Sequence, residues 1–188
     1  MRVFIVILIF IFGLNSLTKA DGIQELEIER MSIGDSLLDH YNNQQISEFI
    51  KLNYPDKKFI FANIILKEKE FYNLQIGYKN GDENYIIELL NGVIRFGQEI
   101  ESCYKKQDQI REFIVSNIIF LKEEDPIIRQ FLPTDAPNKV RTRQFKFNLT
   151  DGNILLYCID HPVENYKEDK LKLQMQTNAM SDYLQSQY

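Results

Sequence analysis

Two Asn-Gly pairs, Asn80-Gly81 and Asn91-Gly92, constrain the fold of this chain more than any other sequence feature. Such pairs favour two-residue hairpin turns, because both central residues of that turn take positive φ. Counting outward from each pair places the same alternate residues on one apolar face, and two independent turns seldom agree by accident. The agreement predicts a three-stranded antiparallel meander over residues 71–97.

Asp151-Gly152 predicts a further hairpin, in which Arg143 faces Asp160 as an opposite-charge pair. Apolar and polar residues alternate over residues 171–175, which predicts another strand. A short helix is expected over residues 180–185.

A long helix is predicted from residue 98 to residue 117, because apolar positions recur every three or four residues. Its predicted inner stripe consists of Ile100, Cys103, Gln107, Ile110 and Ile114. The connection over residues 122–138 holds three prolines and one expected short helix around residues 127–131.

Shorter elements are expected in the first part of the chain. They are a half-exposed strand over residues 24–33, a short helix capped at Asp35 or Ser36, a helix over residues 44–52 and a strand over residues 59–66. Antiparallel strands with single helices between them predict an α+β fold. We expect an antiparallel sheet, a meander plus a hairpin, with one long helix and short helices packed on it.

Residues 1–20 have the layout of a secretory signal peptide. Arg2 is followed by an apolar run of about a dozen residues, too short for the roughly 20 that span a bilayer. We therefore expect a single α+β domain over residues 21–188, with no transmembrane anchor after cleavage. Loss of Arg2 and Lys19 leaves 20 basic residues against 27 acidic ones, a net charge of −7. This charge argues against nucleic-acid binding, which depends on neutralising phosphates.

Cys103 and Cys158 are the two cysteines of the chain. Export would place them where disulfides persist. Cys103 lies on the stripe of the long helix, and Cys158 lies on the apolar face of the last hairpin, opposite Phe145. A disulfide between them is the favoured interpretation, and two separate buried thiols are the alternative. No Cys-x-x-Cys or paired His motif supports a metal site.

The run Ile33–Leu38 resembles the first block of the GDSL esterases, which would make Ser36 a nucleophile. The strand expected before it alternates with glutamates, although that family has a buried apolar strand at this place. The family's catalytic His follows its Asp by three residues, whereas Cys158 stands three residues before His161. A helix N-cap at Ser36 explains the same residues.

Arg141 and Arg143 form a basic stretch on the last hairpin. They are a candidate site for a small anionic ligand, and a solvated hairpin end is the alternative. His40 and His161 each follow an aspartate, but adjacent side chains diverge on a strand or helix and do not form a chelate.

Four runs resemble an uncharacterised family of small exported proteins from marine SAR11-type alphaproteobacteria. They are Glu29–Asp39, Pro55–Phe59, Cys103–Asp108 and Leu171–Leu184. The resemblance implies no activity and no cofactor. It implies a Gram-negative envelope, so a periplasmic location is expected, with the cell exterior as the alternative.

The sequence therefore predicts a non-catalytic periplasmic domain that binds a protein, an envelope component or a small ligand. The basis is a well-specified sheet without a complete catalytic set. A GDSL-like hydrolase using Ser36 is the second hypothesis. An envelope assembly factor that pairs through an exposed strand edge is the third.

Overall fold

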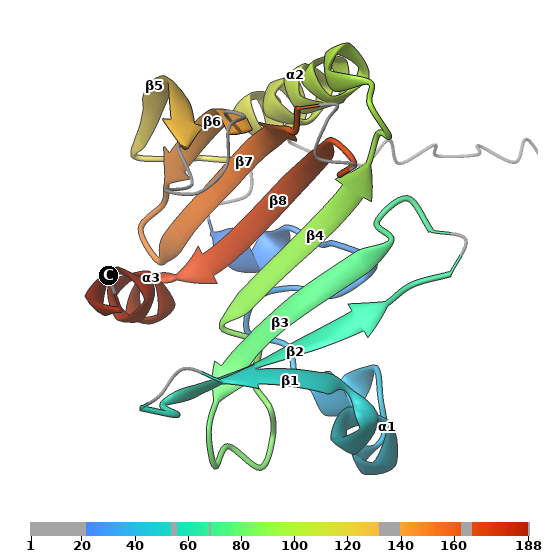
Figure 1. Cartoon of the computed structure of the whole chain (residues 1–188). Coiled ribbons are helices and arrows are strands. Elements are labelled where there is room, and N and C mark those ends of the chain that lie inside the picture. Colours follow the sequence, from blue (N-terminus) through green and yellow to red (C-terminus); the bar gives the residue numbers. More distant parts are fainter. Residues whose placement is uncertain (1–21, 54–55, 68, 132–139, 163–166, 188) are drawn as a thin grey trace, which may run out of the picture.

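The computed structural model describes residues 22–53, 56–67, 69–131, 140–162 and 167–187. One antiparallel sheet of eight strands, in the order β1-β2-β3-β4-β8-β7-β6-β5, forms its centre (Figure 1). Helix α2 (Ile100–Asn117) packs on one face of the sheet, and helix α3 (Asn178–Ser186) packs on the other. The α+β fold expected from the sequence is confirmed.

The first four strands form a meander: β1 (Ile50–Asn53), β2 (Phe59–Ile65), β3 (Asn73–Lys79) and β4 (Leu89–Arg95). The next three form a second antiparallel group: β5 (Lys122–Phe131), β6 (Val140–Asn148) and β7 (Gly152–Asp160). Strand β8 (Lys170–Thr177) pairs with β4 on one side and β7 on the other. It thereby joins the two groups into one sheet.

The segment before β1 covers the same face as α2. It contains two 3₁₀ turns, η1 (Ile23–Glu25) and η2 (Leu37–Asp39), and the short helix α1 (Asn43–Glu48). Its inward residues belong to the main core and are almost fully buried: Ile23, Ile28, Met31, Ile33, Leu37 and Ile46. Burial of this apolar surface, at about 25 cal/mol per Å², is what holds an otherwise irregular segment on the sheet.

The three-stranded meander predicted over residues 71–97 is wrong, because only two strands, β3 and β4, lie there, and its predicted turns are wrong too. Asn91 and Gly92 lie inside β4, where Gly92 pairs with Leu74 and Leu173. The ring of Phe71 lies so close that a Cβ atom on Gly92 would approach its Cδ1 to 2.5 Å. This glycine therefore serves close packing inside a strand and not a turn.

The Asn80-Gly81 pair does bend the chain, but the strands beside it do not form a tight hairpin. Nine residues, 80–88, separate β3 from β4. Residues 85–87 hydrogen-bond to residues 34–37 of the N-terminal segment instead of to β3. The pairing of residues 85–87 with the N-terminal segment therefore overrides the local preference for a hairpin at Asn80-Gly81.

The strand predicted over residues 24–33 is also wrong. Glu29 and Arg30 both have positive φ and form a tight turn, across which Ile28 and Met31 exchange main-chain hydrogen bonds. The buried residues of this stretch therefore face one another across a turn.

The expected helix at residues 127–131 is wrong too, because these residues belong to edge strand β5. Pro126 lies at the irregularity between Glu124 and Ile127 in the pairing of β5 with β6, a position that tolerates a missing N–H. Residues 132–138 of the expected connection lie outside the described residues.

The hairpin at Asp151-Gly152 is confirmed, with a register two residues from the prediction. Arg141 faces Asp160, and Arg143 faces Cys158. A shift of two residues leaves every side chain on its predicted face.

The structure also confirms the long helix, the strand at residues 170–177 and the helix that follows it. The predicted signal peptide, residues 1–20, lies outside the described residues. Across the part of the chain that the structure describes, no helix is long and apolar enough to cross a membrane.

Candidate functional site

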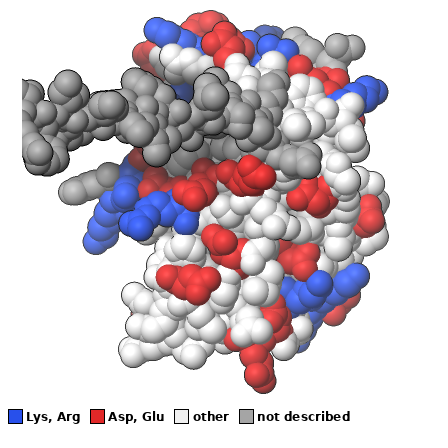
Figure 2. Space-filling model, turned by 180° about the vertical axis from the view of Figure 1, so that it is seen from behind, with Lys and Arg blue, Asp and Glu red and all other residues white. Residues whose placement is uncertain are grey.

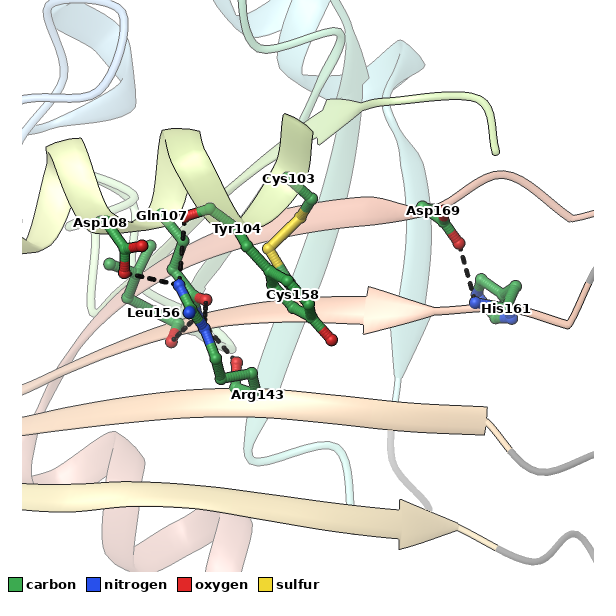
Figure 3. Close-up of a disulfide and its surroundings, with 9 residues drawn as sticks. All are labelled: Cys103, Tyr104, Gln107, Asp108, Arg143, Leu156, Cys158, His161 and Asp169. Atoms are coloured by element: carbon green, nitrogen blue, oxygen red, sulfur yellow. Dashed lines mark hydrogen bonds and ion pairs between the residues drawn. A yellow bond between two sulfur atoms is a disulfide. The ribbon is translucent and has the colours of Figure 1, made fainter. Parts of the chain in front are cut away.

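The predicted disulfide is present. Sγ of Cys103 in α2 bonds to Sγ of Cys158 in β7 at 2.03 Å, across 55 residues of sequence (Figure 3). Both residues are fully buried beside Leu156 and Leu171. The bond attaches the first half of α2 to β7, an inner strand of the sheet, and it is compatible with an exported protein.

Gln107 lies one helical turn after the disulfide and is fully buried. Its Nε2 donates to the main-chain oxygens of Arg143 and Leu156 at 2.7 and 3.0 Å. Its Oε1 accepts a hydrogen bond from Nε of Arg143 at 2.6 Å (Figure 3). Gln107, the polar residue on the predicted apolar stripe, therefore connects α2 to the sheet through hydrogen bonds.

Arg143 makes contacts with α2 on several sides. Its Nη2 donates to Oδ1 of Asp108 at 2.6 Å and to the main-chain oxygen of Tyr104 at 3.1 Å. Its Cζ lies 4.5 Å from the centre of the Tyr104 ring, within the range of a cation–π contact. Arg141 is exposed and faces Asp160. An anion site at Arg141 and Arg143 stays a prediction, and the bonded donors of Arg143 would contribute little to it.

Ser36 occupies the N-cap of η2. Its Oγ accepts a hydrogen bond from the main-chain N–H of Leu38 at 3.1 Å and donates to the main-chain oxygen of Asn84 at 2.6 Å. Among the described residues, neither histidine hydrogen-bonds to Ser36. The geometry is that of a cap, and the serine also anchors the loop that contains Asn84.

The two histidines lie in different places. Nε2 of His40 is 3.5 Å from Oδ2 of Asp35 at a partly exposed position. The main-chain N–H of His161 donates to Oδ1 of buried Asp169 at 2.8 Å (Figure 3). Burial lowers the pKa of His161 and raises the pKa of Asp169. Within the described residues, no group of three or more His, Cys, Asp and Glu side chains is placed to hold a metal ion.

A pocket of about 300 Å³ lies between α2, the N-terminal segment and the sheet. Most of its lining is apolar: Leu26, Phe71, Ile110, Phe113, Ile114, Leu173 and Met175. Phe113 is 56% exposed, whereas its helix neighbour Ile114 is 1% exposed. An aromatic ring left this open beside an apolar pocket is the feature of the described surface that most resembles a ligand site.

Gly92 sets the position of one wall of this pocket. The ring of Phe71 lies over Gly92, and Ile28 touches the same position from the N-terminal segment. A larger residue in β4 would push the Phe71 ring outward. The pocket therefore depends on the glycine that the sequence pattern assigned to a turn.

Charged residues stand at the edge of the pocket. Glu27, Glu70 and Lys106 lie there, and Nζ of Lys106 pairs with Oε1 of Glu70 at 2.5 Å. Figure 2 shows the side of the molecule opposite to that of Figure 1, where acidic side chains gather across the middle and basic ones lie mainly toward the margins. One carboxylate at the pocket edge has no partner in the pocket lining, so the edge repels anions.

Sequence reasoning named Ile110 and Ile114 as core residues but missed the pocket. Phe113 was the residue that could have indicated the pocket. It lies beside the buried stripe of α2, where an aromatic side chain is not needed to fill the core. Comparisons of the chain with known protein families, curated proteins and solved structures found no match.

Proposed function

We propose that this protein is a non-catalytic binding domain that takes a small apolar ligand into the pocket beside α2. The open Phe113 ring at a mostly apolar cavity is the observation that supports this proposal. Transfer of ligand surface from water onto such a lining would supply the binding free energy.

Size and charge narrow the class of ligand. A volume of about 300 Å³ is at the lower end of the range for small-molecule sites. Because Lys106 neutralises Glu70, the carboxylate of Glu27 gives the edge a net negative charge, which favours a neutral or positively charged molecule over a fatty acid or other anion. We also propose that the protein is located in the periplasm and that it belongs to the SAR11-type family that the sequence resembles.

Binding of the neutral dye Nile red tests the proposal. Phe113→Glu places a charge at the open side of the pocket and should abolish the fluorescence increase. Ile119→Glu is the matched control, because Ile119 is 49% exposed and does not line the pocket. Equal dye binding by the two variants would reject the pocket as the site.

Strand β1 supports a second candidate, an assembly factor that pairs through a strand edge. Its Ile50 and Leu52 are 65% and 53% exposed, and β1 pairs with β2 alone among the described strands. Such an edge can accept a strand from another protein. Pull-down from envelope extracts should lose its partner with Leu52→Lys and keep it with Leu121→Lys, a change at another exposed leucine.

A further inference from the structure

The face of the sheet turned to the viewer in Figure 1 carries α3 at one end and is not covered by any other described helix. A row of amide side chains crosses this face. The adjacent strands β2, β3, β4 and β8 each contribute one amide residue to the row, and each residue is paired with the amide residue on the neighbouring strand. The four residues are Asn63, Gln75, Asn91 and Gln174. Asparagine is depleted in strands, so strand propensity does not account for the row.

A second group of amides lies beside this row, next to α3. Nε2 of Gln174 donates to Oε1 of Gln176 at 2.6 Å, and Nε2 of Gln176 donates to Oδ1 of Asn153 at 3.1 Å. Gln176 and Asn153 are each 4% exposed. These hydrogen bonds hold the amides in fixed orientations, which lowers the entropy that a bound ligand must remove.

A groove of about 390 Å³ runs between these amides and α3. Gln144 lines it from the sheet, and Ser181 and Gln185 line it from the helix. Its two charged residues neutralise each other, because Nζ of Lys146 lies 3.2 Å from Oε1 of Glu124. The groove therefore offers hydrogen-bonding groups without net charge, which suits a neutral ligand.

Asn91 provides an independent observation. It is 3% exposed, and its Oδ1 has no hydrogen-bond partner within the described part of the protein. A buried acceptor without a partner is costly, and native proteins satisfy nearly all of them. Asn91 faces Gln174, which lines the groove, so a donor from the ligand would reach the covered Oδ1 of Asn91 where the side chain of Gln174 moves aside.

The chemistry of the face identifies the ligand class. An amide donates and accepts hydrogen bonds at once, as does a sugar hydroxyl. Tyr157 lies on the same face, directly opposite Gln144 and Lys172, and adds an aromatic ring of the kind that contacts the C–H side of a sugar. Four strands about 4.8 Å apart give the row a length of about 14 Å, which fits a chain of rings better than a single ring.

We propose that this open sheet face binds a neutral glycan chain, at a site separate from the apolar pocket on the other face. The amides of Gln144 and Gln174 contact the sugar hydroxyls. Asn91 accepts a hydrogen bond from the chain or from a water that the chain holds in place.

Titration calorimetry of the full chain with maltohexaose, cellohexaose and chitohexaose tests this inference. We expect binding of at least one of them, weakened about fivefold by Gln144→Ala and by Gln174→Ala, which corresponds to about one hydrogen bond each. Gln109→Ala, an exposed glutamine on α2, and Phe113→Glu at the apolar pocket should bind the glycan like the wild type. Failure of glycan binding can therefore be distinguished from failure of dye binding at the apolar pocket.

Asn91→Leu distinguishes a binding role from a structural one. Removing an unsatisfied buried acceptor should raise the melting temperature of the free protein by about 2–4 °C and weaken glycan binding. Two results would overturn the proposal: no heat with any of the three sugars at about 5 mM, or unchanged affinity in Gln144→Ala, Gln174→Ala and Asn91→Leu.

Discussion

Nε of Arg143 and Oε1 of Gln107 form a 2.6 Å hydrogen bond between β6 and α2. Since Nε2 of Gln107 also donates to two main-chain oxygens of the sheet, the amide is satisfied at both ends. This hydrogen bond lies one helical turn from Cys103, so a hydrogen bond and a disulfide both attach the same part of α2 to the sheet.

Gln107→Ala should lower the free energy of unfolding by about 2–3 kcal/mol, because it leaves the Arg143 guanidinium and two carbonyl groups without this partner. Urea unfolding followed by circular dichroism measures the change. Gln109→Ala changes an exposed glutamine on the same helix and should stay within about 0.5 kcal/mol of the wild type. Similar losses in the two variants would contradict this account.

Removing the disulfide should cost about 2–4 kcal/mol, because the unfolded chain gains conformational entropy when the loop between Cys103 and Cys158 is no longer closed. The double variant Cys103→Ser/Cys158→Ser and the reduced wild type should unfold at similarly lowered urea concentrations. Alkylation before intact-mass measurement checks the bond directly. Two alkylated thiols in protein that has seen no reductant would show that the bond is absent.

Gly92→Ala should destabilise the protein by about 1–3 kcal/mol and weaken dye binding, because its Cβ would collide with the Phe71 ring. Phe71→Leu should relieve the collision. We therefore expect the cost of Gly92→Ala to fall by at least about 1 kcal/mol when Phe71→Leu is already present. An equal cost in both backgrounds would mean that another contact limits residue 92.

Asp169 should give the fold a measurable pH dependence. Burial raises its pKa above the ordinary value of 3.8, so the folded state favours the protonated acid. Its stabilising contribution is therefore full below pH 3.8 and is lost as the pH rises through the raised pKa. Asp169→Asn keeps an acceptor for the N–H of His161 and carries no charge.

We expect Asp169→Asn to gain stability relative to the wild type as the pH is raised from 3.5 to 7. Chemical unfolding across this range measures the difference. His161, whose pKa is lowered, acts in the opposite direction, but it is present in both proteins and affects them alike to first order. A difference that does not vary with pH would contradict the prediction.

Ser36→Ala separates the cap from the nucleophile. Loss of the N-cap should cost about 1 kcal/mol, with no change in a broad esterase screen. Ser47→Ala, at an exposed serine in α1, is the control for the hydroxyl loss. Esterase activity that disappears with Ser36→Ala alone would favour the hydrolase hypothesis over a binding domain.

The features that the sequence predicted well depend on local periodicity. The helix of residues 100–117 was visible from its three- and four-residue spacing, and Cys103 lies on its inner face as expected. The pairing with Cys158 followed from the alternation of the last hairpin. Its register was wrong by two residues, because the turn is centred on Thr150-Asp151 and not on Asp151-Gly152, and the shift left the inward face unchanged.

The features that it missed depend on contacts between distant segments. Gly92 lies in a strand because Phe71, which is 21 residues away, packs over it, and a two-residue turn motif carries no sign of that contact. Residues 85–87 pair with residues 34–37 in the same way. The pocket and the amide face both arise from such long-range placement, so single-segment patterns did not reveal either site.

Strand β8 follows the other seven strands in sequence and yet lies between β4 and β7. A ribosome therefore completes both neighbours before it makes the strand that connects them. Until Lys170–Thr177 emerges, β4 and β7 each keep an unpaired edge. The two groups of strands therefore join into one sheet only after the last strand has been made.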